Sequence, residues 1–210
     1  MSDKKASAST DPRMPVDLLE VLQRRFGLAR TSDLEQAGIP RWRLSRLVDV
    51  GILERVRRGL YRAADLPMTP DLELVQVCAA IPHSVVFLAS ALFYYGLTTY
   101  YPNGVWLAVR QNDRPVHLVS PPIRLHFLTP KYHQMGVSQI STPSGRIRIY
   151  DREKTLCDSI RFRNEIGLDV ALEALRNYLR SPGASRARIL KYARLCRVES
   201  TMRRYLEAMI

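Results

Sequence analysis

Four charged residues late in the chain have types and spacing that could support metal-dependent chemistry. Asp151, Glu153, Lys154 and Asp158 combine carboxylates with a lysine, as nuclease centres do when they hold a metal ion that activates water. Such a centre draws carboxylates from a strand and its neighbour, whereas here Asp151 stands where a helix begins and Glu153 falls in its first turn. Carboxylates at that place cap a helix and interact with its dipole. We therefore favour helix capping and keep a nuclease as the alternative.

Other signatures of catalysis or metal binding do not occur in the sequence. It has no phosphate-binding glycine-rich loop, no G-x-S-x-G and no H-E-x-x-H. Its three cysteines are far apart, which favours small buried side chains in a reducing compartment over disulfides. Its histidines lack the spacing of metal ligands. We expect no metal, no cofactor and no enzymatic activity. These residues are Cys78, Cys157, Cys196, His83, His117, His126 and His133.

An arginine-rich segment near residue 43 has the composition of a helix that reads DNA. On a helix over 40–51, Leu44 and Leu47 share one face, and Trp42 and Arg46 point the opposite way. A recognition helix places such residues in the major groove, where a guanidinium can bridge O6 and N7 of guanine. For Trp42, packing between domains is the alternative. The DNA-binding residues predicted on this helix and the one before it are Thr31, Ser32, Arg41, Trp42, Arg43, Ser45 and Arg46.

A basic hairpin is predicted directly after this helix, with strands over 52–57 and 60–63 around the turn Arg57-Arg58-Gly59. Strand alternation puts Arg55 and Arg57 on one face and Val56 on the other. Arg58 at the tip is placed to enter a minor groove or touch a phosphate, so that affinity would fall with salt. The predicted DNA-binding residues of this hairpin are Arg55, Arg57, Arg58 and Arg62.

The elements that position these residues describe a winged helix-turn-helix. A helix is predicted over 15–26, where the apolar residues have helical spacing and Gly27 ends it. A short second helix, with Thr31 as its N-cap, ends at Gly38, and the third helix ends at Gly51. Three short helices followed by a basic hairpin are typical of this DNA-binding fold.

The rest of the chain predicts an α+β fold, in which a mixed α/β C-terminal domain ends in helices. After a proline-containing linker over 65–70, helices are expected over 71–80 and 84–95. Short β-rich segments then fill 105–149, and helices are expected over 152–162, 168–179, 186–195 and 200–209. The predicted organisation is a disordered arm over 1–14, a winged helix-turn-helix over 15–66 and a C-terminal domain over 67–210.

The charge of the chain points to a polyanionic partner. Thirty-two Lys and Arg against twenty Asp and Glu give a net charge of +12 and a pI near 10.1. Nucleic acid is the commonest polyanion of a cytosol, and the sequence shows neither a membrane-spanning run nor a signal peptide. We therefore expect a cytoplasmic protein that binds double-stranded DNA. A possible second basic face comprises Arg186, Arg188, Lys191, Arg194, Arg197, Arg203 and Arg204.

Five stretches of the sequence resemble a known family. They are ARTSDLEQAGIPRWRLSRLVDVGILERVRRGLYR, ASALFYYGLT, VWLAVRQNDRP, YDREKTLCDSIRFRNEIGLDVALEALRNYLR and ILKYARLCRVESTMRRYLEAM. Many winged helices share features of the first stretch, and the ordered set of later stretches is more specific. Together they resemble AbiEi-type antitoxins, the transcriptional regulators of type IV toxin–antitoxin (abortive infection) operons involved in phage defence.

The resemblance implies a protein with two functions. Its winged helix would bind inverted repeats upstream of its own operon and repress transcription. Its C-terminal domain would provide antitoxicity against a nucleotidyltransferase-like toxin, without a stable complex between the two proteins. A stand-alone regulator whose toxin gene is absent is the alternative.

Overall fold

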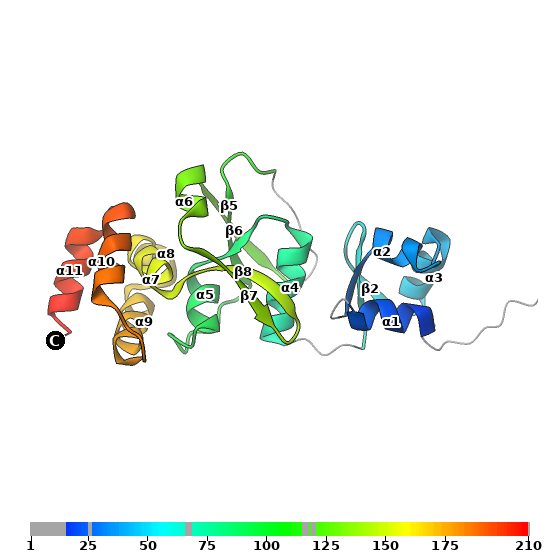
Figure 1. The fold of residues 1–210 in the computed structure, drawn as a ribbon, viewed down its shortest axis with the longest axis horizontal. Helices are drawn as coiled ribbons and strands as arrows, with labels where there is room; N and C mark the ends of the chain where they lie inside the picture. The colour runs from blue at the N-terminus through cyan, green and yellow to red at the C-terminus, as the bar shows by residue number, and fades with distance from the viewer. Residues whose placement is uncertain (1–15, 25–26, 66–68, 115–117, 119–120, 210) are drawn as a thin grey trace, which may run out of the picture. The chain divides into compact units, whose positions relative to one another are not determined.

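In a computed structural model the chain forms two compact units, residues 1–67 and 68–210. The structure describes residues 16–24, 27–65, 69–114, 118 and 121–209. The arm predicted over 1–14 lies outside these residues. Helices and sheets occur in both units (Figure 1), so the mixed α+β class is confirmed.

The first unit contains three helices and a small antiparallel sheet with the strand order β1-β3-β2. Each of the three helices and one of the strands contributes a leucine to the core of this unit. These buried residues are Leu18, Leu34, Leu44 and Leu53. The sheet forms because β3 pairs on both sides, with β1 and with β2. The elements are α1 (Val16–Arg24), β1 (Leu28–Arg30), α2 (Thr31–Gln36), α3 (Arg41–Asp49), β2 (Leu53–Arg57) and β3 (Leu60–Ala63).

Two expectations for this unit were wrong, and one strand was missed. Strand β1 had not been predicted. The N-cap of α2 is Arg30, whose backbone N–H donates to Asp33 Oδ2 at 3.0 Å, and Thr31 is the first helical residue. Regular alternation in β2 fails because the register with β3 shifts between Arg55 and Arg57. Val56 is buried at that irregularity.

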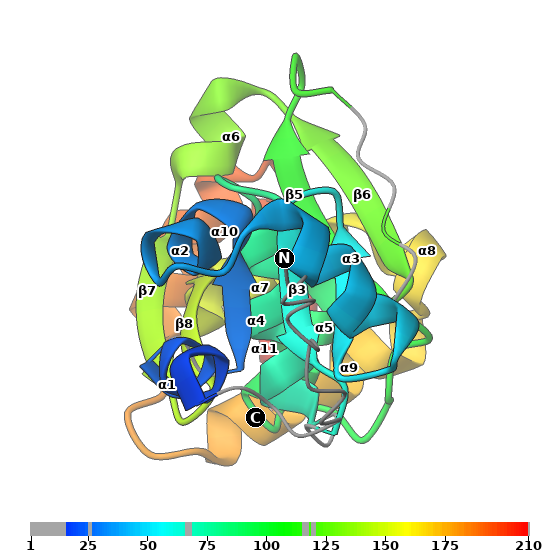
Figure 2. The same ribbon diagram turned by 90° about the vertical axis from the view of Figure 1, so that its right-hand side faces the viewer.

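The second unit is built on a mixed five-stranded sheet with the order β6-β5-β4-β8-β7. Strands β6 and β7 lie at its opposite edges (Figure 2). The elements are α4 (Pro70–Ala80), β4 (Val85–Val86), α5 (Leu88–Tyr94), β5 (Val105–Arg110), β6 (Ile123–Leu128), α6 (Pro130–Gln134), β7 (Val137–Thr142), β8 (Gly145–Tyr150), α7 (Arg152–Arg161), α8 (Arg163–Ile166), α9 (Leu168–Arg180), α10 (Arg186–Leu195) and α11 (Glu199–Glu207).

The helix predicted over 84–95 is divided in the structure. Val85 and Val86 form the central strand β4, which pairs with β5 on one side and β8 on the other, and α5 begins only at Leu88. Both valines are fully buried. Branching at Cβ favours strand over helix for such residues, and their pairing partners are remote in sequence.

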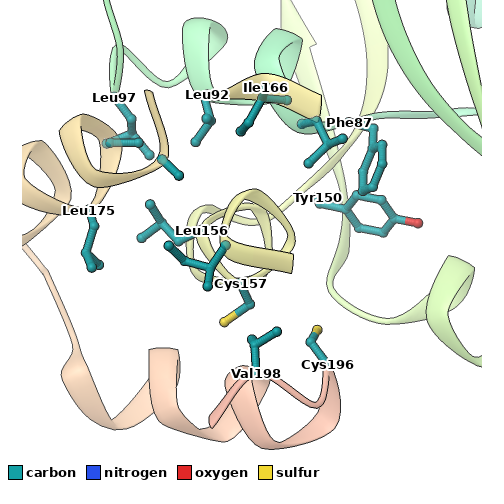
Figure 3. Packing of buried hydrophobic residues seen from close by; sticks show 14 of the residues in the cluster. Phe87, Leu92, Leu97, Tyr150, Leu156, Cys157, Ile166, Leu175, Cys196 and Val198 are labelled. Atoms are coloured by element: carbon teal, nitrogen blue, oxygen red, sulfur yellow. The ribbon is translucent and has the colours of Figure 1, made fainter. Parts of the chain in front are cut away.

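Helix α7 is the centre of the helical part of the second unit. It packs against α5, α9, α10 and α11, and α10 and α11 lie at the end remote from the sheet (Figure 1). Figure 3 shows Leu156 on one side of α7 beside Leu92 and Leu97, with Cys196 and Val198 on another side. All five side chains are buried. A helix enclosed on so many sides must bury polar residues too, because few of its positions face water.

Candidate nucleic-acid interface

Helix α3 has one buried face and one exposed face, as the apolar spacing predicted. Leu44 and Leu47 are buried, whereas Trp42, Ser45 and Arg46 are exposed. The indole of Trp42 is 68% exposed, and a large aromatic side chain left in water is unusual on a monomeric surface. The helix therefore presents an aromatic ring, a hydroxyl and a guanidinium on its solvent side.

The arginines on and near this face differ in their burial and in whether they already form an ion pair within the protein. Arg41 Nε lies 2.6 Å from Glu35 Oε1, an exposed pair that links α3 to α2. Arg43 is half-buried. Among the described residues, neither Arg43 nor Arg46 forms an ion pair. A phosphate or a base edge would therefore meet Arg46 with no internal carboxylate competing for it.

Strands β2 and β3 place the predicted hairpin arginines in four different environments. Arg58 is exposed at the turn. Arg55 lies over the Tyr61 ring, with its guanidinium carbon 5.8 Å from the ring centroid. Arg62 pairs with Glu54 at 2.5 Å, and its side chain is 13% exposed. Arg57 is half-buried, and its Nε is enclosed without a hydrogen-bond partner among the described residues.

The start of α2 lies against the hairpin turn. The backbone N–H of Thr31 donates to the Gly59 carbonyl at 3.0 Å, and Gly59 has the left-handed φ of +81° that glycine adopts without strain. Ser32, the next residue, is exposed. Arg30, which precedes them, is also exposed and was missed by sequence reasoning, because its position became clear only with the pairing of β1 to β3. The contact of Thr31 with Gly59 brings the start of α2 to the hairpin turn.

Of the acidic and lysine residues considered for nuclease chemistry, Glu153, Lys154 and Asp158 are buried in the second unit, and Asp151 is half-buried. Asp151 caps α7, accepting a hydrogen bond from the Lys154 N–H at 2.8 Å, which confirms the capping interpretation. Lys154 Nζ lies 2.5 Å from Asp158 Oδ2. Burial raises the pKa of the Asp158 carboxyl, and Lys154 opposes that rise. Among the described residues, no group of three or more His, Cys, Asp or Glu side chains could hold a metal ion.

Glu153 belongs to a hydrogen-bonded junction of α7, α9 and α10. Tyr178 Oη donates to Glu153 Oε1 at 2.5 Å and accepts from the Ser185 N–H at 2.8 Å. Arg188 pairs with Glu153 Oε2 at 3.0 Å, and Tyr192 Oη donates to Asp151 Oδ2 at 2.5 Å. The carboxylates are thus satisfied by side chains that hold helices together.

The residues of the predicted second basic face are all exposed, but they do not form a uniform cationic surface. Arg188 is engaged by Glu153, and Arg194 and Arg203 both bind Glu199. The remaining members have no ion pair within the described part of the chain. They are Arg186, Lys191, Arg197 and Arg204.

Comparisons with known proteins give a match to a family and a similarity to a solved structure. Residues 16–64 match the family described as transcriptional regulator, AbiEi antitoxin. The curated proteins contain no match. The crystal structure of the RV2827C protein from Mycobacterium tuberculosis is similar, with a TM-score of 0.55 and 13% identity over 96% of this chain and 84% of that chain.

That structural likeness shows a shared fold and nothing about function, because the identity is so low. No helix within the described residues has both the length and the apolar character needed to cross a membrane. The family match covers the elements that carry Trp42, Arg46 and Arg58. Over residues 16–64 the chain is therefore similar to the AbiEi antitoxin transcriptional regulators.

Proposed function

We propose that the chain is a sequence-specific repressor of its own operon that binds double-stranded DNA through the first unit. In this proposal the first unit is a winged helix-turn-helix, α2 and α3 form the helix-turn-helix and the turn between β2 and β3 is the wing. The two-faced character of α3 carries the proposal: Leu44 and Leu47 anchor it while Trp42 and Arg46 are left to solvent. The family match over the same residues supports it.

The contacts would be divided between bases and phosphates. Arg46 would read a base edge, because it projects from the exposed face of α3 and a guanidinium suits guanine. Arg58 at the hairpin turn would contact backbone phosphate or a minor groove. Arg41 and Arg62 are held by carboxylates, so they would contribute less unless DNA displaces Glu35 or Glu54.

The test is a binding titration of the full chain against its own upstream DNA and a scrambled duplex, at two salt concentrations. Replacing Arg46 with Ala should cost about 1–3 kcal/mol on the operator if it reads a base, and less on the scrambled duplex. Replacing Arg58 with Ala should weaken both complexes and lower the salt slope by about 1. Arg176, exposed on α9, provides a charge-matched control in Arg176→Ala.

Two results would contradict this assignment. One is an unchanged operator affinity and footprint in both Arg46→Ala and Trp42→Ala. The other is equal, salt-labile binding of the wild-type chain to the operator and the scrambled duplex, which would leave only a general attraction of a basic protein to nucleic acid.

We further propose that the protein is an antitoxin against a nucleotidyltransferase-like toxin, with the second unit providing antitoxicity. The antitoxin family assignment over 16–64 supports this step. Where a gene for a nucleotidyltransferase-like protein lies beside this one, its expression with and without this protein tests the step through growth. If Arg46→Ala still rescues growth, antitoxicity does not depend on operator binding. If the wild-type chain fails to rescue growth, the antitoxin proposal is contradicted and only the role as a regulator remains. Co-elution of the two purified proteins would show that they bind each other directly, which would contradict a mechanism without a stable complex.

A further inference from the structure

A pocket of about 160 Å³ lies within the second unit, between the first turns of α4, the helix α5 and the segment that leads into β5. Its wall includes Glu73 and Asp71 from α4, Phe93 and Tyr94 from α5, and Tyr101. Ser90 also lines it, but its hydroxyl already accepts the Trp106 N–H at 3.0 Å. The lining therefore joins three aromatic rings with two carboxylates.

The electrostatic character of this pocket is opposite to that of the chain as a whole. No Lys or Arg occurs between Arg62 and Arg110 in a protein whose net charge is +12. Burial raises the pKa of Glu73, and a hydrogen bond from the Tyr101 hydroxyl opposes the rise. Glu73 is half-buried with no ion pair among the described residues. A cation in the pocket would supply the countercharge that Glu73 lacks.

The aromatic residues are arranged to meet such a cation. Phe93 and Tyr101 are perpendicular, with ring centroids 5.0 Å apart, and Tyr101 is 56% exposed although its ring is large. Tyr94 adds a third ring, half-buried on α5. An organic cation within about 6 Å of a ring face is attracted by the negative quadrupole of the ring. Carboxylates lining the same pocket strengthen that preference and disfavour anions.

We propose that this pocket binds an organic cation, an alkylammonium or guanidinium group carried on a short apolar stem. Its volume of about 160 Å³ is similar to that of a cavity of about 150 Å³ known to hold benzene, which is enough for one such group. A neutral apolar ligand of the same size would fill the space but leave the Glu73 carboxylate further desolvated and unpaired, which is costly. The pocket is independent of the proposed DNA interface, because all its lining residues belong to the second unit.

Calorimetric titration of the full chain without DNA tests the proposal. The probes are choline, agmatine and 3,3-dimethylbutan-1-ol, the uncharged carbon isostere of choline. We expect the cations to bind at least about ten-fold more tightly than the neutral isostere. Acetyl-arginine-methylamide is added to distinguish a free small molecule from an arginine side chain of a peptide, since both present a guanidinium. Tighter binding of agmatine indicates the first source, and tighter binding of the blocked arginine the second.

Variants then connect binding to the named residues. Glu73→Gln keeps the size of the side chain and removes its charge, so cation affinity should fall at least about ten-fold. Tyr101→Ala should lower it about five-fold through loss of a ring, and Tyr101→Phe should retain most of it. Glu207→Gln on α11, exposed and remote in the fold, is the control and should bind as the wild type does. Circular dichroism confirms that each variant is folded.

Equal affinity for choline and its neutral isostere would overturn the proposal, because the pocket would then be only an apolar hollow. So would the absence of heat for every cation at up to about 10 mM, or undiminished cation binding in Glu73→Gln. None of these results would bear on operator binding, which is measured with different variants and with DNA.

Discussion

Lys154 and Asp158 form an ion pair one turn apart on α7, with Nζ 2.5 Å from Oδ2 and both side chains almost fully enclosed. The Lys154 ammonium also lies 4.4 Å from the centroid of the Tyr150 ring. Both charges have been taken out of water, and their mutual attraction is the main interaction that offsets the loss of hydration. Removing one of the two residues should therefore cost more stability than removing one member of an exposed ion pair.

Lys154→Met should lower the free energy of unfolding of the second unit by about 3–5 kcal/mol, because it leaves the Asp158 carboxylate buried without a partner. The double variant Lys154→Met, Asp158→Leu should regain most of that loss, since no charge then remains in the core. Urea denaturation followed by circular dichroism measures both. A cost below about 1 kcal/mol for Lys154→Met, typical of exposed pairs, would contradict this account.

Two substitutions on α3 should separate its buried and exposed faces. Leu44→Ala should destabilise the first unit by about 2–5 kcal/mol, because Leu44 is 1% exposed and its removal leaves a cavity. Trp42→Ala should change stability by no more than about 0.5 kcal/mol, because its indole is mostly in solvent. Thermal and urea unfolding monitored by circular dichroism compare the two. A large loss of stability in Trp42→Ala would instead favour the packing role considered for this residue.

Gly136 lies where a side chain has no room. Its φ is +72°, and an added Cβ would lie 2.9 Å from Lys154 Cβ and 3.1 Å from Tyr192 Oη. Gly136→Ala should therefore combine left-handed strain of about 1–2 kcal/mol with about 1–3 kcal/mol of overpacking. Gly96 is the matched control, because its φ of +63° is similar and nothing lies within 4 Å of the added atom. Equal destabilisation in the two alanine variants would show that crowding at Gly136 is relieved without cost.

The carboxyl of Glu199 should titrate well below the ordinary pKa of a glutamate. Hydrogen bonds from Arg194 and Arg203 lower its pKa from 4.5 to about 2. Because the folded-state pKa lies below the unfolded value, its contribution to stability is present above pH 4.5 and is lost as the pH falls towards 2. A carboxyl-detected NMR titration measures the pKa directly. It should rise towards 4.5 in the variant Arg194→Met, Arg203→Met, and an unchanged midpoint would contradict the assignment of its cause.

Helix α3 was predictable because its apolar residues are regularly spaced. Strands β1 and β4 were not, because the strands that they pair with are remote in the sequence. Leu44 and Leu47 identify the buried face of α3 without any knowledge of its neighbours. Strand β1 is too short to have a pattern of its own and forms because Leu28 lies opposite Arg62. Val85 and Val86 are apolar in either secondary structure, and only β5 and β8 decide that they form a strand.

The functional and buried polar sites also divide into those set by local spacing and those set by tertiary packing. The spacing of Asp151 before Lys154 was sufficient to predict a helix cap, but charged residues are ordinarily exposed, so the burial of Lys154 was not predictable. The pocket depends on packing that places Glu73 beside Tyr101. Neither residue belongs to a motif, and the sequence separates them by a strand and a helix.

The absence of Lys and Arg between Arg62 and Arg110 also determines how the protein can be dissected. Trypsin cleaves after those two residues, so it has no site where the two units meet at 67 and 68. Its nearest sites are on β3 of the first unit and at the end of β5 in the second. Tryptic fragments will therefore never correspond to the two units, and isolating each intact requires expression from separate genes or a protease of different specificity.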